Sequence, residues 1–490
     1  MKLKKSKKKL GLAHGVFDVV HSGHLLHFEE CKKYCDKLIV SITDDAFVNK
    51  GPGRPYFNSS ERVRFLKSIK FIDQVIINKD FTPIKLIKKL KPDYYFKGKD
   101  YLDFSKDLTG NIKIEKKEIE KFGGKIILTK SKIKSSSSIL NNDFDILGTD
   151  VKKTIKIINK KKIINFFKEN INNKINKKIL ILGDPIIDKY TYVETLGKSQ
   201  KNQIIVTKFK EEKTFGGGSL LVSIFLEKLF KSVDLISIKN HFNDKFYKKF
   251  LGNKINKISI KDENSKMTVK NRFVNYYRGE RLYQINHNDS QNLTKSSNSR
   301  LISYLKKKLM KYDKVVIFDF GHGIINSDVL KFINKNSQKF LINCQSNSSN
   351  FGFNIASKYE SGYAICMDEM EFRLCLRDNQ NSIKFLIKKN LKFINKFKYF
   401  VITMGKDGCF VINNKKIFFI PTIYKSIKDT TGSGDIFFSM FAYLITSSKL
   451  GVIEISFLSH ITAGLHSIKE GNASKDDLKN IFRVFENLIK

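Results

Sequence analysis

Residues 10–24 read LGLAHGVFDVVHSGH, and this stretch decides the fold of the first part of the chain. An apolar run ends in a glycine turn at Gly15, and a helical pattern begins beside His21 and His24. A strand that passes through a tight turn into a helix is the first unit of an alternating β/α architecture. It also brings backbone amides and the positive end of a helix to one place, where they can bind phosphate.

The same alternation continues outward from this stretch through both halves of the chain. In the first half, short apolar runs typical of strands are KLIVSI, QVIIN, DYYFK and KIILT. The pattern restarts at 177–184 and continues with SVDLIS, DKVVIFDF, KFLIN, GYAIC and KYFVIT. This predicts two α/β domains with doubly wound parallel sheets, at 9–140 and 178–490. Residues 141–177 are expected to be a linker or the closing helices of the first domain.

The charge balance is strongly positive, with 91 Lys and Arg against 48 Asp and Glu over 490 residues, a formal net charge of +43. Such a field attracts phosphate polymers. However, 81 of the 91 basic residues are Lys and they are spread over the whole chain, whereas nucleic-acid readers favour Arg. We therefore expect compositional drift of an AT-rich genome and no nucleic-acid partner.

The sequence shows neither a membrane span nor an export signal. No stretch approaches eighteen consecutive apolar residues, and the basic start MKLKKSKKKLGLAHG has no apolar core behind it. We expect no membrane partner and a cytoplasmic location. The six cysteines show no CxxC pair and no zinc-like spacing, so buried reduced thiols are expected.

His21 and His24 form the first candidate site. Three residues apart, they are expected on one face of a helix. Two imidazoles there can stabilise charge that builds on a phosphate during in-line displacement. The alternatives are capping or core histidines, or part of a metal site; the position after a strand and a glycine turn favours phosphate.

GVFDVVHSGH resembles the HxGH signature of the cytidylyltransferase-like nucleotidyltransferases. Nearly all of 9–140 is similar to the adenylyltransferase domain of the bifunctional heptose-phosphate kinase/adenylyltransferases. The further matching motifs are Lys50-Gly-Pro-Gly-Arg54-Pro, Glu61-Arg62, KPDYYFKGKDY from Lys91, and Ser135–Ser138. The resemblance implies a Rossmann-like fold with His21, His24 and Lys50 in catalysis. It also implies nucleotide or phosphate contacts from Gly15, Phe17, Arg54, Lys97, Ser135, Ser136 and Ser137.

The residue types agree with these roles. Lys50 and Arg54 lie in a Gly/Pro loop that suits a clamp on triphosphate charge. The serines at 135–138 are expected at a helix start, where hydroxyls and amides can bind phosphate. A solvated surface charge is the alternative for each cation, and an exposed linker is an equal alternative for the serine run.

The second candidate site is Lys428-Asp-Thr-Thr-Gly-Ser-Gly-Asp435, followed by an apolar helix. Gly432 and Gly434 permit a tight turn whose amides point together at the helix N-terminus, an oxyanion hole for a moving phosphoryl group. Asp435 then stands where a carboxylate can accept the proton of an attacking sugar hydroxyl. The alternative is an ordinary acidic helix start that complements the dipole.

DTTGSGD resembles the signature of the ribokinase-like (PfkB) sugar kinases, which implies an α/β sandwich with a small β lid. Supporting segments in the family's order are Gly183–Asp188, Phe215–Gly218, the lid pair 267–289, Asp368–Glu371 and Thr403–Gly408. The resemblance makes Asp435 the catalytic base. It implies nucleotide contacts from Thr403, Gly405, Gly408, Asp429, Thr431, Gly432, Ser433 and Gly434. It implies sugar contacts from Asp184, Asp188, Gly216 and Gly217, and indirect Mg²⁺ contacts from Asp368 and Glu371.

Several positions depart from the resembled families. Ser219-Leu220-Leu221 stands where an Asn usually follows the glycine pair, and Asp368 replaces the first Asn of an Asn-x-x-Glu element. Heptose kinases carry Asp-Pro-Lys where this chain has Asn343-Cys344-Gln345, and Asp-Tyr-x-Lys-Gly where it has DFGHG around His322. These changes leave the sugar open. The domain order also differs, because the kinase comes first in the resembled bifunctional enzymes.

Together the motifs predict a bifunctional enzyme of nucleotide-sugar biosynthesis. By resemblance, the second domain phosphorylates a heptose 7-phosphate-like sugar at its anomeric hydroxyl with ATP and Mg²⁺. The first domain transfers AMP from ATP to the sugar 1-phosphate and releases pyrophosphate, with ADP-heptose for the lipopolysaccharide core as the expected product. A homodimer through the lid is compatible with this resemblance. Open alternatives are CTP with another sugar or polyol phosphate, a kinase-like domain that only binds sugar, and a nucleic-acid-binding protein.

Overall fold

The computed structural model describes residues 8–98, 111–130, 136–142, 146–252, 254–287, 292–424, 427–468 and 477–489. The chain divides into two compact units. Unit 1 contains Met1–Lys156, Phe167–Ile171 and Leu478–Lys490, and unit 2 contains Ile157–Phe166 and Asn172–Asp477.

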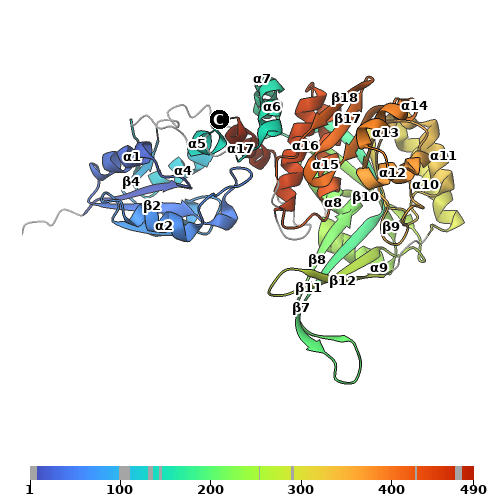
Figure 1. Ribbon diagram of the computed structural model, residues 1–490, viewed down its shortest axis with the longest axis horizontal. Helices are drawn as coiled ribbons and strands as arrows, with labels where there is room; N and C mark the ends of the chain where they lie inside the picture. Colours follow the sequence, from blue (N-terminus) through green and yellow to red (C-terminus); the bar gives the residue numbers. More distant parts are fainter. Residues whose placement is uncertain are drawn as a thin grey trace, which may run out of the picture. The chain divides into compact units, whose positions relative to one another are not determined.

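Unit 1 is built on a parallel sheet in the order β3-β2-β1-β4-β5. Its strands are β1 (Leu10–Gly15), β2 (Lys37–Thr43), β3 (Gln74–Asn78), β4 (Tyr94–Lys97) and β5 (Lys125–Leu128). Its helices are α1 (Ser22–Lys32), α2 (Ser59–Lys67), α3 (Ile84–Leu90), α4 (Asn111–Glu120), α5 (Ser136–Asn142), most of α6 (Thr149–Ile157) and α17 (Leu478–Leu488) (Figure 1). Because the strand order reverses between β1 and β4, ligands are expected at the carboxyl ends of these two strands.

Both faces of this sheet are buried, which explains the continuous apolar runs in its sequence. Ala13, Val40 and Phe96 belong to the core on one side, and Leu12 and Ile39 belong to the core on the other. The alternation of neighbours along β1 and β2 thus divides the apolar side chains between two helical layers.

Helix α17 lies in unit 1, although the sequence suggested that 178–490 forms one kinase domain. The physical reason is its apolar face: the rings of Phe482 and Phe485 pack on Phe167, with centroids 5.1 and 6.3 Å apart. The described part of residues 141–177 contains the end of α5, then α6, α7 (Lys160–Asn170) and the start of β6.

Unit 2 is built on a larger sheet in the order β10-β9-β6-β13-β14-β15-β16-β17-β18. Neighbouring strands are parallel as far as β16, and β17 and β18 are antiparallel. The strands are β6 (Ile175–Gly183), β9 (Phe230–Lys239), β10 (Asn256–Lys261), β13 (Lys314–Asp319), β14 (Phe340–Cys344), β15 (Gly362–Asp368), β16 (Phe397–Thr403), β17 (Cys409–Asn413) and β18 (Lys416–Ile420).

Helices cover both faces of this sheet (Figure 1). They are α8 (Ser219–Glu227), α9 (His241–Leu251), α10 (Lys295–Lys308), α11 (Ser327–Lys335), α12 (Glu369–Leu376), α13 (Ile383–Lys389), α14 (Leu391–Ile394), α15 (Ser433–Ser447) and α16 (Val452–Ser467). Short 3₁₀ turns in the chain are η1 (Asp45–Phe47), η4 (Leu309–Lys311), η5 (Ser337–Lys339), η6 (Ala356–Lys358) and η7 (Gly405–Asp407).

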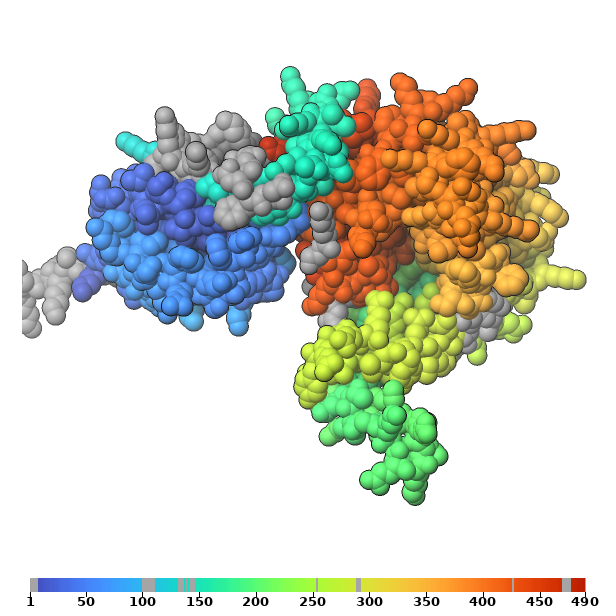
Figure 2. Space-filling model, viewed as in Figure 1, coloured from blue at the N-terminus to red at the C-terminus, as the bar shows by residue number. Residues whose placement is uncertain are grey.

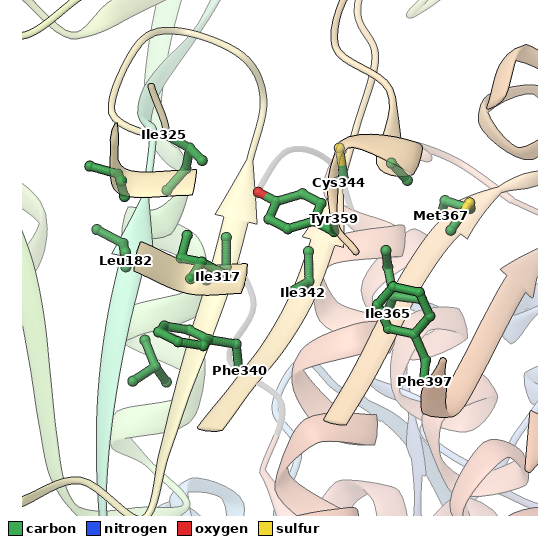
Figure 3. Close-up of a cluster of buried hydrophobic side chains, with 14 of the residues drawn as sticks. Leu182, Ile317, Ile325, Phe340, Ile342, Cys344, Tyr359, Ile365, Met367 and Phe397 are labelled. Carbon is green, nitrogen blue, oxygen red and sulfur yellow. The ribbon is translucent and has the colours of Figure 1, made fainter. Parts of the chain in front are cut away.

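The core of unit 2 contains a row of apolar side chains that crosses four parallel strands. Leu182 is in register with Ile317, Ile317 with Ile342, and Ile342 with Ile365, and all four are buried (Figure 3). This row fixes the strand register, so the polar residues just beyond it emerge together at the carboxyl edge of the sheet.

A separate four-stranded sheet in the order β12-β11-β7-β8 forms the lid. Its strands are β7 (Pro185–Lys198), β8 (Ile205–Gly218), β11 (Thr268–Asn275) and β12 (Arg281–His287). The expected pair at 267–289 is present as β11 and β12. The long antiparallel hairpin β7–β8 was not expected, and it projects from unit 2 as a narrow arm (Figure 2).

Among the residues that the structure describes, no helix is both long and apolar enough to cross a bilayer. The six cysteines are free thiols; Cys375 is half-buried and the others are buried.

Candidate active sites

His21 and His24 cap helix α1 reciprocally. The Gly23 N–H donates to His21 Nδ1 (3.1 Å), and the His21 N–H approaches His24 Nδ1 at 3.4 Å. Because each Nδ1 accepts, the neutral rings carry their proton on Nε2, which is then a donor. His21 Nε2 is buried and has no hydrogen-bond partner among the described residues. The pair therefore combines the capping role with a donor available to a phosphate oxygen.

The two imidazoles are neutral in the ligand-free protein. Burial lowers the pKa of His24 to about 3, and the neighbouring His21 and Lys50 lower it further electrostatically. Burial also lowers the pKa of His21. We expected these rings to neutralise phosphate charge; as neutral groups they could instead donate hydrogen bonds to a phosphate, and an incoming phosphate would raise both pKa values.

The turn before α1 is shaped by Gly15 and Phe17. A Cβ on Gly15 would lie 3.0 Å from the ring of Phe17. Phe17 has a left-handed backbone conformation (φ 49°), and its ring packs edge-on against His24. The Asp18 carboxylate accepts the N–H groups of Tyr56 (2.8 Å) and Phe57 (3.0 Å). These contacts join the turn to the loop that follows Arg54.

Arg62 belongs to a matching motif in the sequence, but the sequence assigned no role to it. In the structure it is a structural cation. Its side chain is fully buried and donates to the carbonyls of Val16 (2.6 Å), Phe57 (3.0 Å) and Thr43 (2.9 Å) and to the Asp45 carboxylate. Arg62 therefore holds three segments that border the site.

The structure brings Arg54 together with the serines of α5. The Arg54 guanidinium donates to Ser137 Oγ (3.3 Å), Ser137 O (3.1 Å) and Asn141 Oδ1 (2.8 Å). The Ser136 hydroxyl donates to the carbonyl of Val19, in the glycine turn (3.2 Å). Ser135 lies outside the described residues.

Lys50 and Lys97 place positive charge beside the histidines. Lys50 is close enough to lower the pKa of His14 and His24 electrostatically. Lys97, at the end of β4, forms a buried ion pair with Glu115 (2.9 Å). This pairing offsets the charge of Lys97.

In unit 2, a cavity of about 370 Å³ opens at the carboxyl edge of the parallel sheet. Nine of the predicted site residues line it: Asp368, Glu371, Thr403, Gly405, Gly408, Gly432, Ser433, Gly434 and Asp435. They follow the strand ends of β15 and β16 or begin α15, which is where doubly wound sheets bind ligands.

Asp435 is a buried carboxyl held at the floor of this cavity. Its Oδ1 accepts from Gln345 Nε2 (2.6 Å) and Asn343 Nδ2 (3.2 Å). Burial raises the pKa of Asp435 to about 7, the Gln345 hydrogen bond opposes the rise, and the charge of Asp188 adds to it. A carboxyl with this pKa is matched to proton transfer near neutral pH.

The glycine turn before α15 is open toward the cavity. Gly432 adopts φ 75°, which favours glycine. Within the described residues, and apart from the adjoining residues and the backbone of α15 itself, no atom lies within 4 Å of the place that a Cβ on Gly434 would occupy, and Ser433 Oγ is buried without a hydrogen-bond partner. This leaves amides and a hydroxyl at a helix N-terminus for a phosphoryl group.

Gly434→Ala is expected to weaken ATP binding while leaving the fold intact. The φ of Gly434 is ordinary and alanine favours helix over glycine by about 1 kcal/mol, so the melting temperature should hold or rise. The methyl group would occupy the space in which phosphate approaches the turn, and KM for ATP should rise by about tenfold or more, as expected when a helix N-terminus loses an anion contact. An unchanged KM for ATP would place the phosphates elsewhere.

Asp429 and Thr431 connect the signature loop to the lid. Asp429 accepts from Tyr190 Oη (3.0 Å), from the Thr431 N–H (2.9 Å) and from Arg281, which also donates to Thr431 Oγ1 (2.6 Å). Neither residue lines the cavity. Their contacts hold the loop in place, whereas the resemblance implied nucleotide contacts.

The residues expected to contact the sugar differ in their surroundings. Asp188 forms a buried ion pair with Arg272 of lid strand β11. Asp184 accepts the N–H groups of Phe320, His322 and Ile324 at 3.0–3.3 Å, so its carboxylate orders that loop.

Gly216 and Gly217 lie opposite β7 in the lid sheet, where a Cβ on Gly216 would meet Leu220 Cβ at 3.2 Å. The Leu220 side chain that replaces the family's Asn is fully buried in α8. The departure at this position therefore puts an apolar residue into the core of unit 2.

Asp368 and Glu371 form a capping box at the start of α12. Each accepts the other's backbone N–H at 2.7 Å, and Glu371 also accepts the Ser346 N–H (2.8 Å). Burial, with the charge of Asp368 adding to it, raises the pKa of Glu371 to about 8. Glu371 is buried and Asp368 is exposed, and both line the cavity, where their oxygens could hold a divalent cation through water.

Sequence reasoning missed Lys270 and Arg272 as site residues. They are two residues apart on β11 and therefore lie on the same face of the lid. Lys270 lowers the pKa values of both Asp435 and His322 electrostatically, so its charge lies near the Asp435 carboxyl. The two-residue spacing of these cations could have indicated a common strand face, but many other basic residues in this Lys-rich chain make such a spacing hard to recognise.

Family comparisons agree with this geometry. The model of the pfkB family of carbohydrate kinases matches residues 176–463, more than half of the chain. The chain belongs to the pfkB family of carbohydrate kinases. A second model, described as cytidylyltransferase-like, matches residues 12–142, so the two domains follow each other in that order. The expected pairing of the two domain types is confirmed.

Among solved structures, phosphofructokinase-2 from Escherichia coli in complex with substrates and products is similar with a TM-score of 0.53 and 11% identity. The match covers 64% of this chain and all of that chain. It supports the fold of the pfkB portion, an α/β sheet with helices on both faces.

Curated relatives named bifunctional protein HldE are similar to this chain. The relative from Aliarcobacter butzleri is 27% identical over 324 residues, which are 64% of this chain and 65% of the relative. The relative from Campylobacter jejuni (serotype O:6) is 42% identical over 103 residues, 21% of this chain and 22% of the relative. The chain thus spans less than two thirds of the length of either relative.

Proposed function

We propose that the pfkB unit phosphorylates a sugar phosphate at its anomeric hydroxyl with ATP. The observation that carries this proposal is Asp435: a buried carboxyl with a pKa of about 7, beside an open glycine turn at a helix N-terminus. Asp435 would accept the hydroxyl proton while the amides around Gly434 and the Ser433 hydroxyl stabilise the moving phosphoryl group.

The sugar would lie between Asp435 and the lid. On that side Lys270 offers a cation, and Asp188 and Arg272 offer a carboxylate and a guanidinium that are paired with each other. This set suits a substrate that has both hydroxyl groups and a phosphate, because carboxylates accept hydroxyl protons and cations bind phosphate. A heptose 7-phosphate-like sugar has this chemistry, in keeping with the relatives named HldE.

Unit 1 would transfer a nucleotidyl group to a sugar 1-phosphate, which forms when a separate phosphatase hydrolyses the other phosphate from the kinase product. The attacking atom is a phosphate oxygen, so the protein needs no nucleophile of its own. His21 and His24 would donate Nε2 hydrogen bonds to the reacting phosphate, and Lys50 and Arg54 would bind the departing pyrophosphate. AMP from ATP is the proposed group, with CTP as the other nucleotide to be tested, and ADP-heptose is the proposed product.

Mg²⁺ is the proposed cofactor of both reactions, since it neutralises phosphate charge when bound. In unit 2, Asp368 and Glu371 would hold it through water. We place the reactions in the cytoplasm, where ATP and sugar phosphates are available, with small molecules rather than nucleic acid or membrane as partners. A homodimer is the proposed assembly and would be tested by light scattering.

The experiment uses the full chain with Mg²⁺, a panel of sugar phosphates, and ATP or CTP. Sugar-dependent ADP formation would support the kinase, and pyrophosphate release with a sugar 1-phosphate would support nucleotidyl transfer. Tight sugar binding without ADP formation would instead show a kinase-like domain that only binds sugar. Tight DNA binding that falls steeply between 50 and 200 mM salt, without either product, would support a nucleic-acid-binding protein.

The kinase rate should depend on the ionisation of Asp435. Its raised pKa means that the base form is populated only above about pH 7, so kcat/KM is expected to fall as pH decreases through about 7. Gln345→Leu removes the 2.6 Å hydrogen bond that favours the charged carboxylate, so the midpoint should move to higher pH. A midpoint near the ordinary aspartate value in both proteins would exclude Asp435 as the titrating base.

A further inference from the structure

Helix α17 provides part of the surface on which residues 50–54 lie. A Cβ on Gly51 would be 3.7 Å from Val484 Cγ1 and 3.9 Å from Leu488 Cδ2, both on α17. This loop carries Lys50 and Arg54, the two cations proposed to bind the triphosphate. The position of the loop is therefore linked to a helix that follows the kinase domain in the sequence.

A chain of hydrogen bonds connects Arg54 to α17 through α5. The Arg54 guanidinium donates to Ser137 Oγ and to Asn141 Oδ1. The Ser137 hydroxyl in turn donates to Asn487 Oδ1 (2.9 Å), and Asn141 Nδ2 donates to the Asn487 carbonyl (2.7 Å). Both ends of the Asn141 amide are thus engaged, which fixes its orientation toward Arg54.

Asn487 is itself held firmly. Its Nδ2 donates to the Arg483 carbonyl (2.7 Å), one turn earlier in α17. The helix is anchored by Phe482 and Phe485, which pack against Phe167 of unit 1. Because the Oδ1 and the Nδ2 of Asn487 both form hydrogen bonds and the helix is anchored, this side chain can determine where its partners lie.

We propose that α17 is part of the nucleotidyl-transfer site and that Asn487 is a positioning residue for Arg54. This inference rests on the proposed function of unit 1. Apart from residues 157–166, the chain stays in unit 1 up to residue 171, then forms the rest of unit 2, and returns to unit 1 at residue 478. Nucleotidyl transfer therefore depends on residues that follow the whole kinase domain, and the first 171 residues alone lack part of the support for their phosphate loop.

The test compares the full chain with Asn487→Leu, which removes the acceptor for Ser137 at similar volume, and Asn487→Asp, which keeps an acceptor oxygen. Lys479→Ala, on the same helix more than two turns earlier, is the matched control. The readouts are hydrogen exchange of peptides covering residues 47–57, and KM and kcat for ATP in pyrophosphate release. Sugar-dependent ADP formation by the same proteins reports on unit 2.

Asn487→Leu is expected to speed exchange in 47–57 and to raise KM for ATP about three- to tenfold, with a smaller change in kcat, since a relayed hydrogen bond is lost. Adding Ser137→Ala should cause little further loss, because both substitutions break the same connection. Asn487→Asp should retain most of the affinity for ATP. Lys479→Ala should leave the exchange rates and KM unchanged, and sugar-dependent ADP formation should be the same in all of these proteins as in the unsubstituted chain.

Unchanged exchange and unchanged KM in Asn487→Leu would overturn the inference. So would an equal fall in both reactions with a lower melting temperature, which would indicate general destabilisation. Failure of the proposed function looks different: the unsubstituted chain would release no pyrophosphate, while the exchange measurement would still show whether α17 supports the loop.

Discussion

Asp435→Asn is expected to lower kcat of the sugar-kinase reaction by about a hundred- to ten-thousandfold, the range for loss of a general base. The substitution removes the proton acceptor but keeps an Oδ1 that accepts from Gln345 and Asn343. The measurement is sugar-dependent ADP formation at pH 8, where Asp435 is ionised in the unsubstituted chain.

The fold should tolerate this change. The folded pKa of Asp435 lies above the ordinary value of 3.8, so its ionisation opposes folding as pH rises through about 7. At pH 8 the neutral amide removes that cost, and the melting temperature should be equal or higher. Asp328→Asn, an exposed aspartate on α11, is the matched control. Near-normal ADP formation by Asp435→Asn would exclude the proposed base.

His21→Asn is expected to lower nucleotidyl transfer by about a hundred- to a thousandfold, as for the loss of one placed donor to a developing charge. Asparagine is a good helix N-cap, so it can replace Nδ1 as the acceptor for the Gly23 N–H while removing the Nε2 donor. The measurement is pyrophosphate release with a sugar 1-phosphate.

Two comparisons separate chemistry from capping. His21→Ala should lose the same activity and also about 1 kcal/mol of stability, because the cap is lost as well. His241→Asn, at the exposed first position of α9, changes the same residue type elsewhere and should leave both reactions unchanged. Full nucleotidyl transfer by His21→Asn would show that the unpartnered Nε2 has no catalytic part.

Much of the fold was predictable because strand signals were local. The runs that became β1, β2 and β6 are continuous and apolar, since both faces of each sheet are covered by helices. The glycine turns were equally predictable, because a short motif of adjacent residues is enough to place backbone amides at the start of a helix. The family models confirm the two domain types that these motifs indicated.

What the sequence did not predict depends on contacts between distant residues. Arg54 meets Ser137 and Asn141 more than eighty residues later, and α17 returns to unit 1 after the kinase domain. Amphipathicity shows that α17 has an apolar face but not which core receives it. Likewise, Lys270 and Arg272 become recognisable only when strand register brings them opposite β7.

Departures from family motifs were visible in the sequence, but their consequences were not. Asn343 and Gln345 replace an Asp and a Lys of the heptose kinases, which suggested a lost substrate contact. In the structure both donate to Asp435 and so favour its charged form. For Asp184 the reverse holds. The residue matches the family motif and was expected to contact the sugar, but its oxygens accept backbone N–H groups in the structure.

The most direct test of two phosphate-transfer sites in one chain is mass analysis of products. The full chain, Asp435→Asn and His21→Asn would each be incubated with ATP, Mg²⁺ and either a heptose 7-phosphate or a heptose 1-phosphate. We expect the unsubstituted chain to add one phosphoryl group to the first and a nucleotidyl group to the second. Each variant should lose only its own product. No new sugar product from the unsubstituted chain with any sugar phosphate or nucleotide in the panel would contradict the account.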